Sequence, residues 1–95
     1  MFKPINSHSA TNDAGVMVSV GNIVRYKHGE RVMDFSATLS PALSEEYSAL
    51  FNVYTPASPR WEAPYEAEPV DTRMVTRHVI EALHALNCEV EFTVA

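Results

Sequence analysis

Residues 59–94, PRWEAPYEAEPVDTRMVTRHVIEALHALNCEVEFTV, decide the fold of this chain. Apolar side chains recur in the middle of the stretch at the spacing of one helical face, at Val75, Val79, Ala82, Leu83 and Leu86. This pattern predicts a helix over residues 72–86. The carboxylate of Asp71 can accept hydrogen bonds from the free N–H groups of the first turn. Asn87 suits the left-handed conformation in which many helices end.

The residues that follow this helix alternate between polar and apolar side chains, reading EVEFTV from Glu89 to Val94. Successive residues of a strand point to opposite faces of the sheet, so a period of two is typical of a half-buried strand. We therefore expect a strand here, with Val90, Phe92 and Val94 facing the core.

Three strands are predicted upstream. Val16–Val20 is short, apolar and rich in β-branched residues, which favours a strand. Ile23–Lys27 and Glu30–Ala37 read as the two strands of a hairpin joined by His28 and Gly29. Glycine supplies the positive φ that a two-residue turn requires.

This turn fixes the expected register of the hairpin, in which the cross-strand pairs are Lys27–Glu30, Tyr26–Arg31 and Val24–Met33. Such pairing gives one face an apolar surface and places Arg25 and Lys27 on the other. The side chains expected on the buried face are Val24, Tyr26, Met33 and Phe35.

The segment Tyr47–Thr55, YSALFNVYT, is compatible with two conformations. Its aromatic and apolar residues suit a strand, which we favour. A helix from Pro41 through Phe51 is the alternative, because several apolar residues also fit helical spacing. The prolines at positions 56, 59 and 64 then impose an extended, unpaired backbone as far as the acidic stretch.

Together these elements predict an α+β fold. We expect a mostly antiparallel sheet of four or five strands with one long helix packed on one face, in the order β-β-β-β-α-β. Residues 1–15 are expected to form an irregular N-terminal arm and residues 16–95 a single domain. The uncovered sheet face leaves room for a homodimer. The expected core consists of Val18, Val24, Tyr26, Met33, Phe35, Leu50, Val75, Val79, Leu83, Leu86, Val90 and Phe92.

Composition excludes several classes of function. The chain has 95 residues, 46% of them hydrophobic, and a net charge of −5, which argues for a folded domain and against binding to nucleic-acid phosphates. Cys88 is the sole cysteine, so no intrachain disulfide forms. No secretory signal and no apolar run near the roughly 18 residues of a membrane span is visible. We expect a protein of the cytoplasm without a membrane segment.

Four acids fall within the ten residues that follow the lone tryptophan, and this stretch contains the candidate partner-binding site. An acidic edge on an extended, proline-rich loop can attract a basic protein, and Trp and Tyr are enriched at binding hot spots. There are two alternatives. Trp61 packs the loop onto the sheet, and the acids are exposed to solvent without binding a partner. The candidate partner-binding residues are Trp61, Glu62, Tyr65, Glu66 and Glu68.

No catalytic or metal-binding constellation is predicted. His78 and His84 are six residues apart, whereas two ligands on one helix face need a spacing of three or four. Cys88 follows His84 across the expected helix end, so a shared metal ion is disfavoured. No glycine-rich phosphate loop occurs either. We expect a protein that is not an enzyme and that needs no cofactor.

The stretch from Arg60 to Phe92 resembles small immunity proteins of bacterial polymorphic-toxin and contact-dependent inhibition systems. The matching features are Trp61 followed by Pro64, then acids and Pro69, then the predicted helix, then the sequence EVEF. The hairpin sequence IVRYKHGERVMDF also looks like the N-terminal strands of that family. One departure is Asn87, where a glycine would be the expected helix stop.

The resemblance implies a function without chemistry: binding of one toxin domain in the cytosol of the producing cell, over its active site or beside it. Many such toxins are nucleases with basic active-site surfaces, which Glu62, Glu66 and Glu68 would complement. The alternative is a small phage- or plasmid-encoded inhibitor or accessory protein that binds a host protein.

Overall fold

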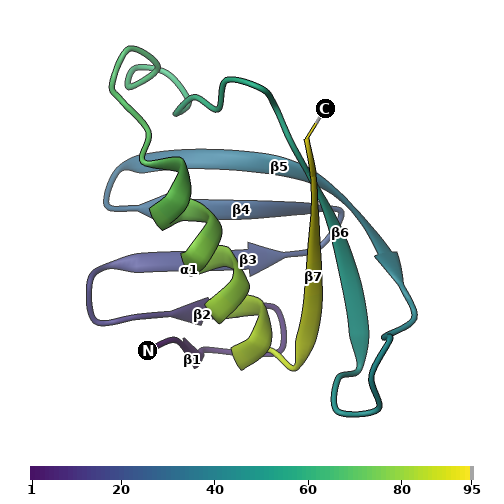
Figure 1. The fold of residues 1–95 in the computed structure, drawn as a ribbon. Coiled ribbons are helices and arrows are strands. Elements are labelled where there is room, and N and C mark those ends of the chain that lie inside the picture. Colours follow the sequence, from purple (N-terminus) through teal and green to yellow (C-terminus); the bar gives the residue numbers. More distant parts are fainter. Residues whose placement is uncertain (95) are drawn as a thin grey trace.

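The computed structural model describes residues 1–94, which form seven β-strands and one α-helix (Figure 1). The α+β class predicted from the sequence is confirmed. The elements in chain order are β1 (Lys3–Pro4), β2 (Ser9–Thr11), β3 (Val16–Val20), β4 (Ile23–His28), β5 (Arg31–Ser40), β6 (Ala49–Thr55), α1 (Thr72–Ala85) and β7 (Cys88–Val94).

The strands lie in the sheet in the order of the sequence, from β1 at one edge to β7 at the other. Every neighbouring pair is antiparallel except β6 and β7, which are parallel because α1 connects them by a crossover. This sheet has seven strands, more than the four or five predicted, and six of them, not four, precede the helix in the chain. Residues 1–15 are also not the irregular arm that we expected, since they contribute β1 and β2 and bury Phe2 and Ala10. Backbone hydrogen bonds hold these strands, and such bonds leave little signal in a polar sequence.

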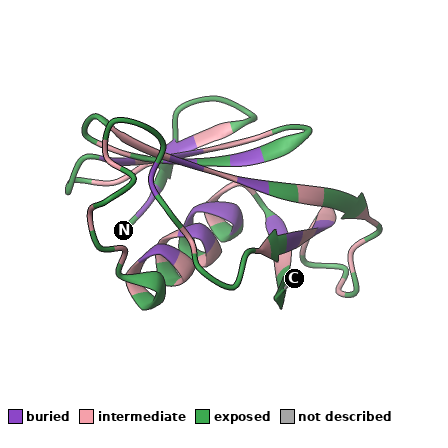
Figure 2. Ribbon diagram, turned by 90° about the horizontal axis from the view of Figure 1, so that it is seen from above, coloured by how far each residue is buried: buried purple, intermediate pink, exposed green. Residues whose placement is uncertain are grey.

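The long strand β5 makes the sheet curl around the helix. Its first half pairs with β4 and its second half pairs with β6, and Ser36 belongs to both pairings. Strands β1–β5 form one layer behind α1. Strands β6 and β7 bend away from this layer and run crosswise to its strands (Figures 1 and 2). The helix therefore lies inside the curve of the sheet.

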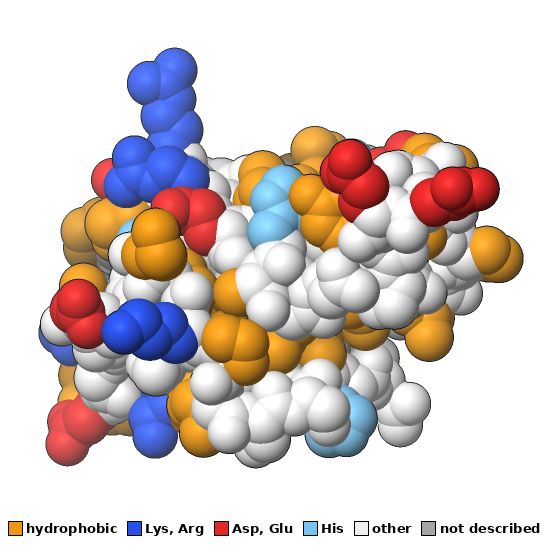
Figure 3. All heavy atoms as spheres, turned by 90° about the horizontal axis from the view of Figure 1, so that it is seen from below, with side chains coloured by type: hydrophobic (Ala, Val, Ile, Leu, Met, Phe, Trp, Pro, Cys, Tyr) orange, Lys and Arg blue, Asp and Glu red, His pale blue; other side chains and the backbone are white. Residues whose placement is uncertain are grey.

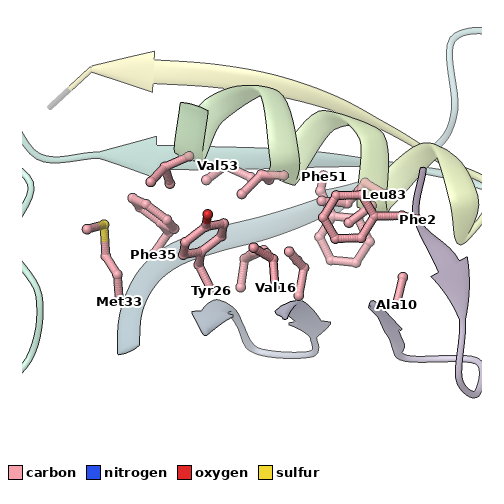
Figure 4. Close-up of a cluster of buried hydrophobic side chains, with 14 of the residues drawn as sticks. Phe2, Ala10, Val16, Tyr26, Met33, Phe35, Phe51, Val53 and Leu83 are labelled. Atoms are coloured by element: carbon pink, nitrogen blue, oxygen red, sulfur yellow. The ribbon is translucent and has the colours of Figure 1, made fainter. Parts of the chain in front are cut away.

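Alternate residues of the strands pack against the inner face of α1 to form the core (Figure 4). Most of the predicted core residues are buried there, and Trp61 joins them. Leu50 is buried as well but lies outside this cluster, while Leu86, Val90 and Phe92 are only partly buried against it. Val94, predicted to face the core, is 71% exposed, because β7 has diverged from α1 at that point (Figures 1 and 2).

The hairpin of β4 and β5 forms with a register shifted by two residues from the predicted one. Lys27 pairs with Val32 and His28 with Arg31, so the turn consists of Gly29 and Glu30. Gly29, at the first central position, has a φ of +64°, as a type II′ turn requires. A shift of two residues leaves every side chain on its predicted face, and the predicted inner residues Val24, Tyr26, Met33 and Phe35 are all buried.

The predicted ends of the helix are confirmed. The carboxylate of Asp71 accepts a hydrogen bond from the Met74 amide at 3.1 Å, and Asn87 has a φ of +62° just beyond the helix. The segment 49–55 is the strand that we favoured, not a helix. Within residues 1–94 no helix is long and apolar enough to cross a membrane.

Candidate partner-binding surface

The acidic loop, residues 56–71, connects the end of β6 to the start of α1 and lies along the first half of β5. There, β5 has no strand on its second side, because its pairing with β6 begins only at Ser36. The Glu62 amide donates to the Val32 carbonyl at 2.8 Å and so continues the hydrogen bonding at this edge. The loop is thereby fixed to the sheet by its backbone as well as by side chains.

Trp61 anchors the acidic loop inside the molecule. The side chain is only 6% exposed, and its indole N–H donates to the Pro69 carbonyl at 3.2 Å. Its ring stacks on Tyr26 of β4 with centroids 5.9 Å apart and planes inclined by 29°. Trp61 is therefore a packing residue, as in the alternative reading of the sequence, because its indole is already covered by the fold.

Tyr65 and Glu68 bind to the turn of the hairpin. The Tyr65 hydroxyl donates to the Glu30 carboxylate at 2.6 Å, an interaction that raises the pKa of Tyr65. The guanidinium of Arg31 lies 4.7 Å from the centre of the Tyr65 ring and pairs with Glu68 at 2.6 Å. Glu68 and Tyr65 therefore position the loop, and the charge of Glu68 is compensated within the chain.

Glu62 and Glu66 remain exposed on the acidic loop. Glu62 lies near the bidentate pair of Arg25 and Asp34, whose nitrogen–oxygen distances are 2.8 and 2.9 Å. The hydrogen bond from Arg25 is the largest influence on the pKa of Asp34 and lowers it. Glu66 makes no ion pair with a described residue. Of the five candidate residues, these two present their carboxylates to solvent without a cation of their own.

Arg31 is the functional residue that sequence reasoning missed. In the predicted register it was a partner of Tyr26, and no acidic residue was assigned to it. In the structure it begins the inner-face alternation of β5 that continues with Met33 and Phe35. A cation at the start of an apolar face needs a nearby acid, and that requirement could have pointed to Glu68.

His78, His84 and Cys88 make their contacts outside the acidic loop. Nδ1 of His78 lies 2.8 Å from the Tyr26 hydroxyl, and His84 stacks on Tyr47. The thiol of Cys88 is buried and directed at the Leu86 carbonyl, and burial raises its pKa. Among residues 1–94, no three His, Cys, Asp or Glu side chains are grouped closely enough to hold a metal ion.

Comparison with known proteins adds no relative to this picture: no protein-family model matches the chain, and neither a curated protein nor a solved structure is significantly similar to it.

Proposed function

We propose that this chain is a non-enzymatic binding protein that neutralises a bacterial toxin, with Glu62 and Glu66 of the acidic loop as its contact residues. The proposal is supported by the resemblance of residues 60–92 to immunity proteins and by the geometry of the loop. Trp61, Tyr65 and Glu68 serve here as positioning residues, which narrows the five-residue site expected from the sequence.

One observation carries the proposal: two exposed carboxylates, neither in an ion pair with a described residue, stand on a backbone that is anchored on both sides. Trp61 and the Glu62 amide fix one side, and the pairing of Glu68 with Arg31 fixes the other. A rigid loop loses little conformational entropy when it binds. Exposed acids on such a loop attract a basic partner from a distance and penalise an acidic one.

The test uses the toxin domain encoded beside the gene for this chain, purified without its own neutraliser. We expect a complex of nanomolar affinity and loss of toxicity on co-expression. Reversal of both charges, Glu62→Lys with Glu66→Lys, should weaken binding by about tenfold per charge, mainly through slower association at low salt. Calorimetry and surface-binding kinetics measure these quantities.

The matched control is Glu45→Lys with Glu46→Lys, which makes the same change in net charge in the loop between β5 and β6. The control should retain nearly the full affinity. Equal weakening in both double variants would mean that net charge alone drives binding. Absence of binding to every adjacent toxin domain, with capture of a host nuclease instead, would replace this function by that of a phage- or plasmid-encoded inhibitor.

A further inference from the structure

The strand β7 ends the sheet with an edge that lacks the usual protection. Within residues 1–94 it pairs only with β6, over seven consecutive residues and without a bulge. It contains neither proline nor lysine, the residues that commonly block an exposed edge. The opposite edge of the sheet is protected, since β1 has two residues and one of them is Pro4. The two edges therefore differ in their readiness to accept another strand.

The C-terminal half of β7 lies away from the helix. The first residues of the strand follow α1 closely, and the two elements then diverge toward the chain end (Figures 1 and 2). Phe92 is only partly buried, and Val94 is 71% exposed on the same face. An added strand with apolar side chains on this inner face would cover both residues, which the present fold leaves incompletely packed.

The outer face of β7 carries Glu89 and Glu91, and neither the neighbouring strand β6 nor the loop before it contains a lysine or arginine. Residues 32–59 and 78–94 include no lysine or arginine, whereas they include Glu45, Glu46, Glu89 and Glu91. The Glu89 carboxylate accepts hydrogen bonds from the amides of Leu43 and Ser44 at 2.7 and 3.1 Å. In Figure 3 the lysines and arginines gather on the left of the view, and the right side shows acids and hydrophobic residues. A docking strand that carries basic side chains on its outer face would be attracted to these acids.

A second copy of this chain is a poor occupant of the same edge. In an antiparallel β7–β7 pair centred on Glu91, the two Glu91 carboxylates lie opposite each other. In the register centred on Val90, Glu89 lies opposite Glu91. Like charges directly opposite on neighbouring strands are destabilising. In these two registers the charge pattern favours a different, basic segment over self-association.

We propose that the free edge of β7 binds an extended segment of a partner protein in which basic and apolar residues alternate, and that this segment adds to the sheet beside β7. Main-chain hydrogen bonds would supply affinity, and the alternation of side chains would supply specificity. Basic residues would face Glu89 and Glu91, while apolar residues would cover Phe92 and Val94. This inference rests on β7 alone and does not require the acidic loop or a toxin.

The first experiment uses a synthetic nine-residue peptide that alternates lysine and valine, added to the isotope-labelled full chain. We expect amide protons of residues 89–94 to shift in NMR spectra and to exchange more slowly with solvent. A peptide of the same composition with its lysines grouped at one end carries the same charge without the alternation, and it should bind at least tenfold more weakly. Equal binding of the two peptides, or shifts confined to the acidic loop, would overturn the proposal.

The second experiment compares two single charge reversals, after circular dichroism has shown both variants to be folded. Glu91→Lys should weaken peptide binding about tenfold, because an attractive cross-strand pair becomes a repulsive one. Asp13→Lys makes the same charge change in the loop between β2 and β3, away from this edge, and should weaken it less than twofold. Equal losses would indicate general attraction between charges and refute strand addition.

Two further outcomes separate this proposal from others. Sedimentation that shows a concentration-dependent dimer, with a dissociation constant changed by Glu91→Lys, would assign the edge to a second copy and refute the basic partner. The Glu62→Lys, Glu66→Lys variant should bind the alternating peptide normally. Failure of the toxin test with retention of peptide binding would thus remove the proposed function and leave the β7 site standing.

Discussion

The hydroxyl of Tyr26 and Nδ1 of His78 lie 2.8 Å apart and join the middle of the sheet to α1. Tyr26 is fully buried, and its ring also stacks against Trp61 of the acidic loop. Phe2, near the N-terminus, packs edge-on against His78 of α1 with ring centroids 5.6 Å apart. These contacts connect four segments that are distant in sequence, so a change at this cluster should affect both core and loop.

Acid should destabilise the fold through His78. Burial, assisted by the nearby charge of Arg77, lowers the pKa of His78 below its ordinary value of 6.5. The unfolded chain therefore binds a proton at a higher pH than the folded protein does. The contribution of neutral His78 is complete above about pH 6.5 and is lost as the pH falls through the lower, folded pKa.

We expect the free energy of unfolding, measured by urea titration with circular dichroism, to decrease between pH 7.5 and 5. His78→Gln should reduce the slope of this decrease. His8→Gln, a control at an exposed position, should leave the slope unchanged. The same slope in the His78→Gln variant as in the wild type would show that His78 is not responsible.

Trp61→Ala should release the acidic loop and destabilise the protein. Removal of this side chain opens a space beside Tyr26 and frees the Pro69 carbonyl, with an expected cost of about 3 kcal/mol. Trp61→Phe keeps a ring in place but loses the hydrogen bond, which should cost about 1 kcal/mol. Hydrogen exchange of residues 62–70 should accelerate in the alanine variant, and unchanged exchange there would contradict the anchoring role.

The cap of α1 gives a prediction with a built-in control. Asp71→Ala removes the acceptor for the Met74 amide and should cost about 1 kcal/mol, which corresponds to a fall in Tm of about 4–8 °C for a domain of this size. Asp71→Asn retains an acceptor oxygen at the same position and should melt close to the wild type. A large loss in the asparagine variant would instead implicate the negative charge.

The parts of the fold that the sequence predicted are those in which side chains carry a clear period. The stripe from Val75 to Leu86 and the alternation after Asn87 fixed α1 and β7, because burial on one face requires such spacing. β1 and β2 were missed because backbone pairing holds them and because Phe2 and Ala10 are too few to form a visible pattern. The contribution of Phe2 and Ala10 to the core appears only once β1 and β2 lie beside the other strands.

The candidate site was predicted less well than the fold, because exposure depends on contacts between distant residues. The neighbours of Trp61 and Glu68 are Tyr26 and Arg31, both more than thirty positions away in the sequence. The wrong hairpin register also hid the pairing of Arg25 with Asp34. The composition correctly identified the loop as acidic. It could not show which of the acids would form ion pairs within the fold.

The hairpin turn offers a test that separates backbone strain from packing. A Cβ added at Gly29 would meet no atom within 4 Å, and the same is true at Gly21. The two positions differ in backbone conformation, since Gly29 has a φ of +64° and Gly21 lies outside the left-handed region. Side chains of L-residues are unfavourable at positive φ whatever the space around them.

Gly29→Ala should therefore destabilise the protein by about 1 kcal/mol. Gly21→Ala should leave it unchanged or stabilise it by about 0.5 kcal/mol, because alanine restricts the unfolded chain. Urea unfolding of the two variants side by side measures the difference. Similar effects at both positions would mean that the turn relaxes to another conformation, and the observed register, with His28 opposite Arg31, would then lose its main local determinant.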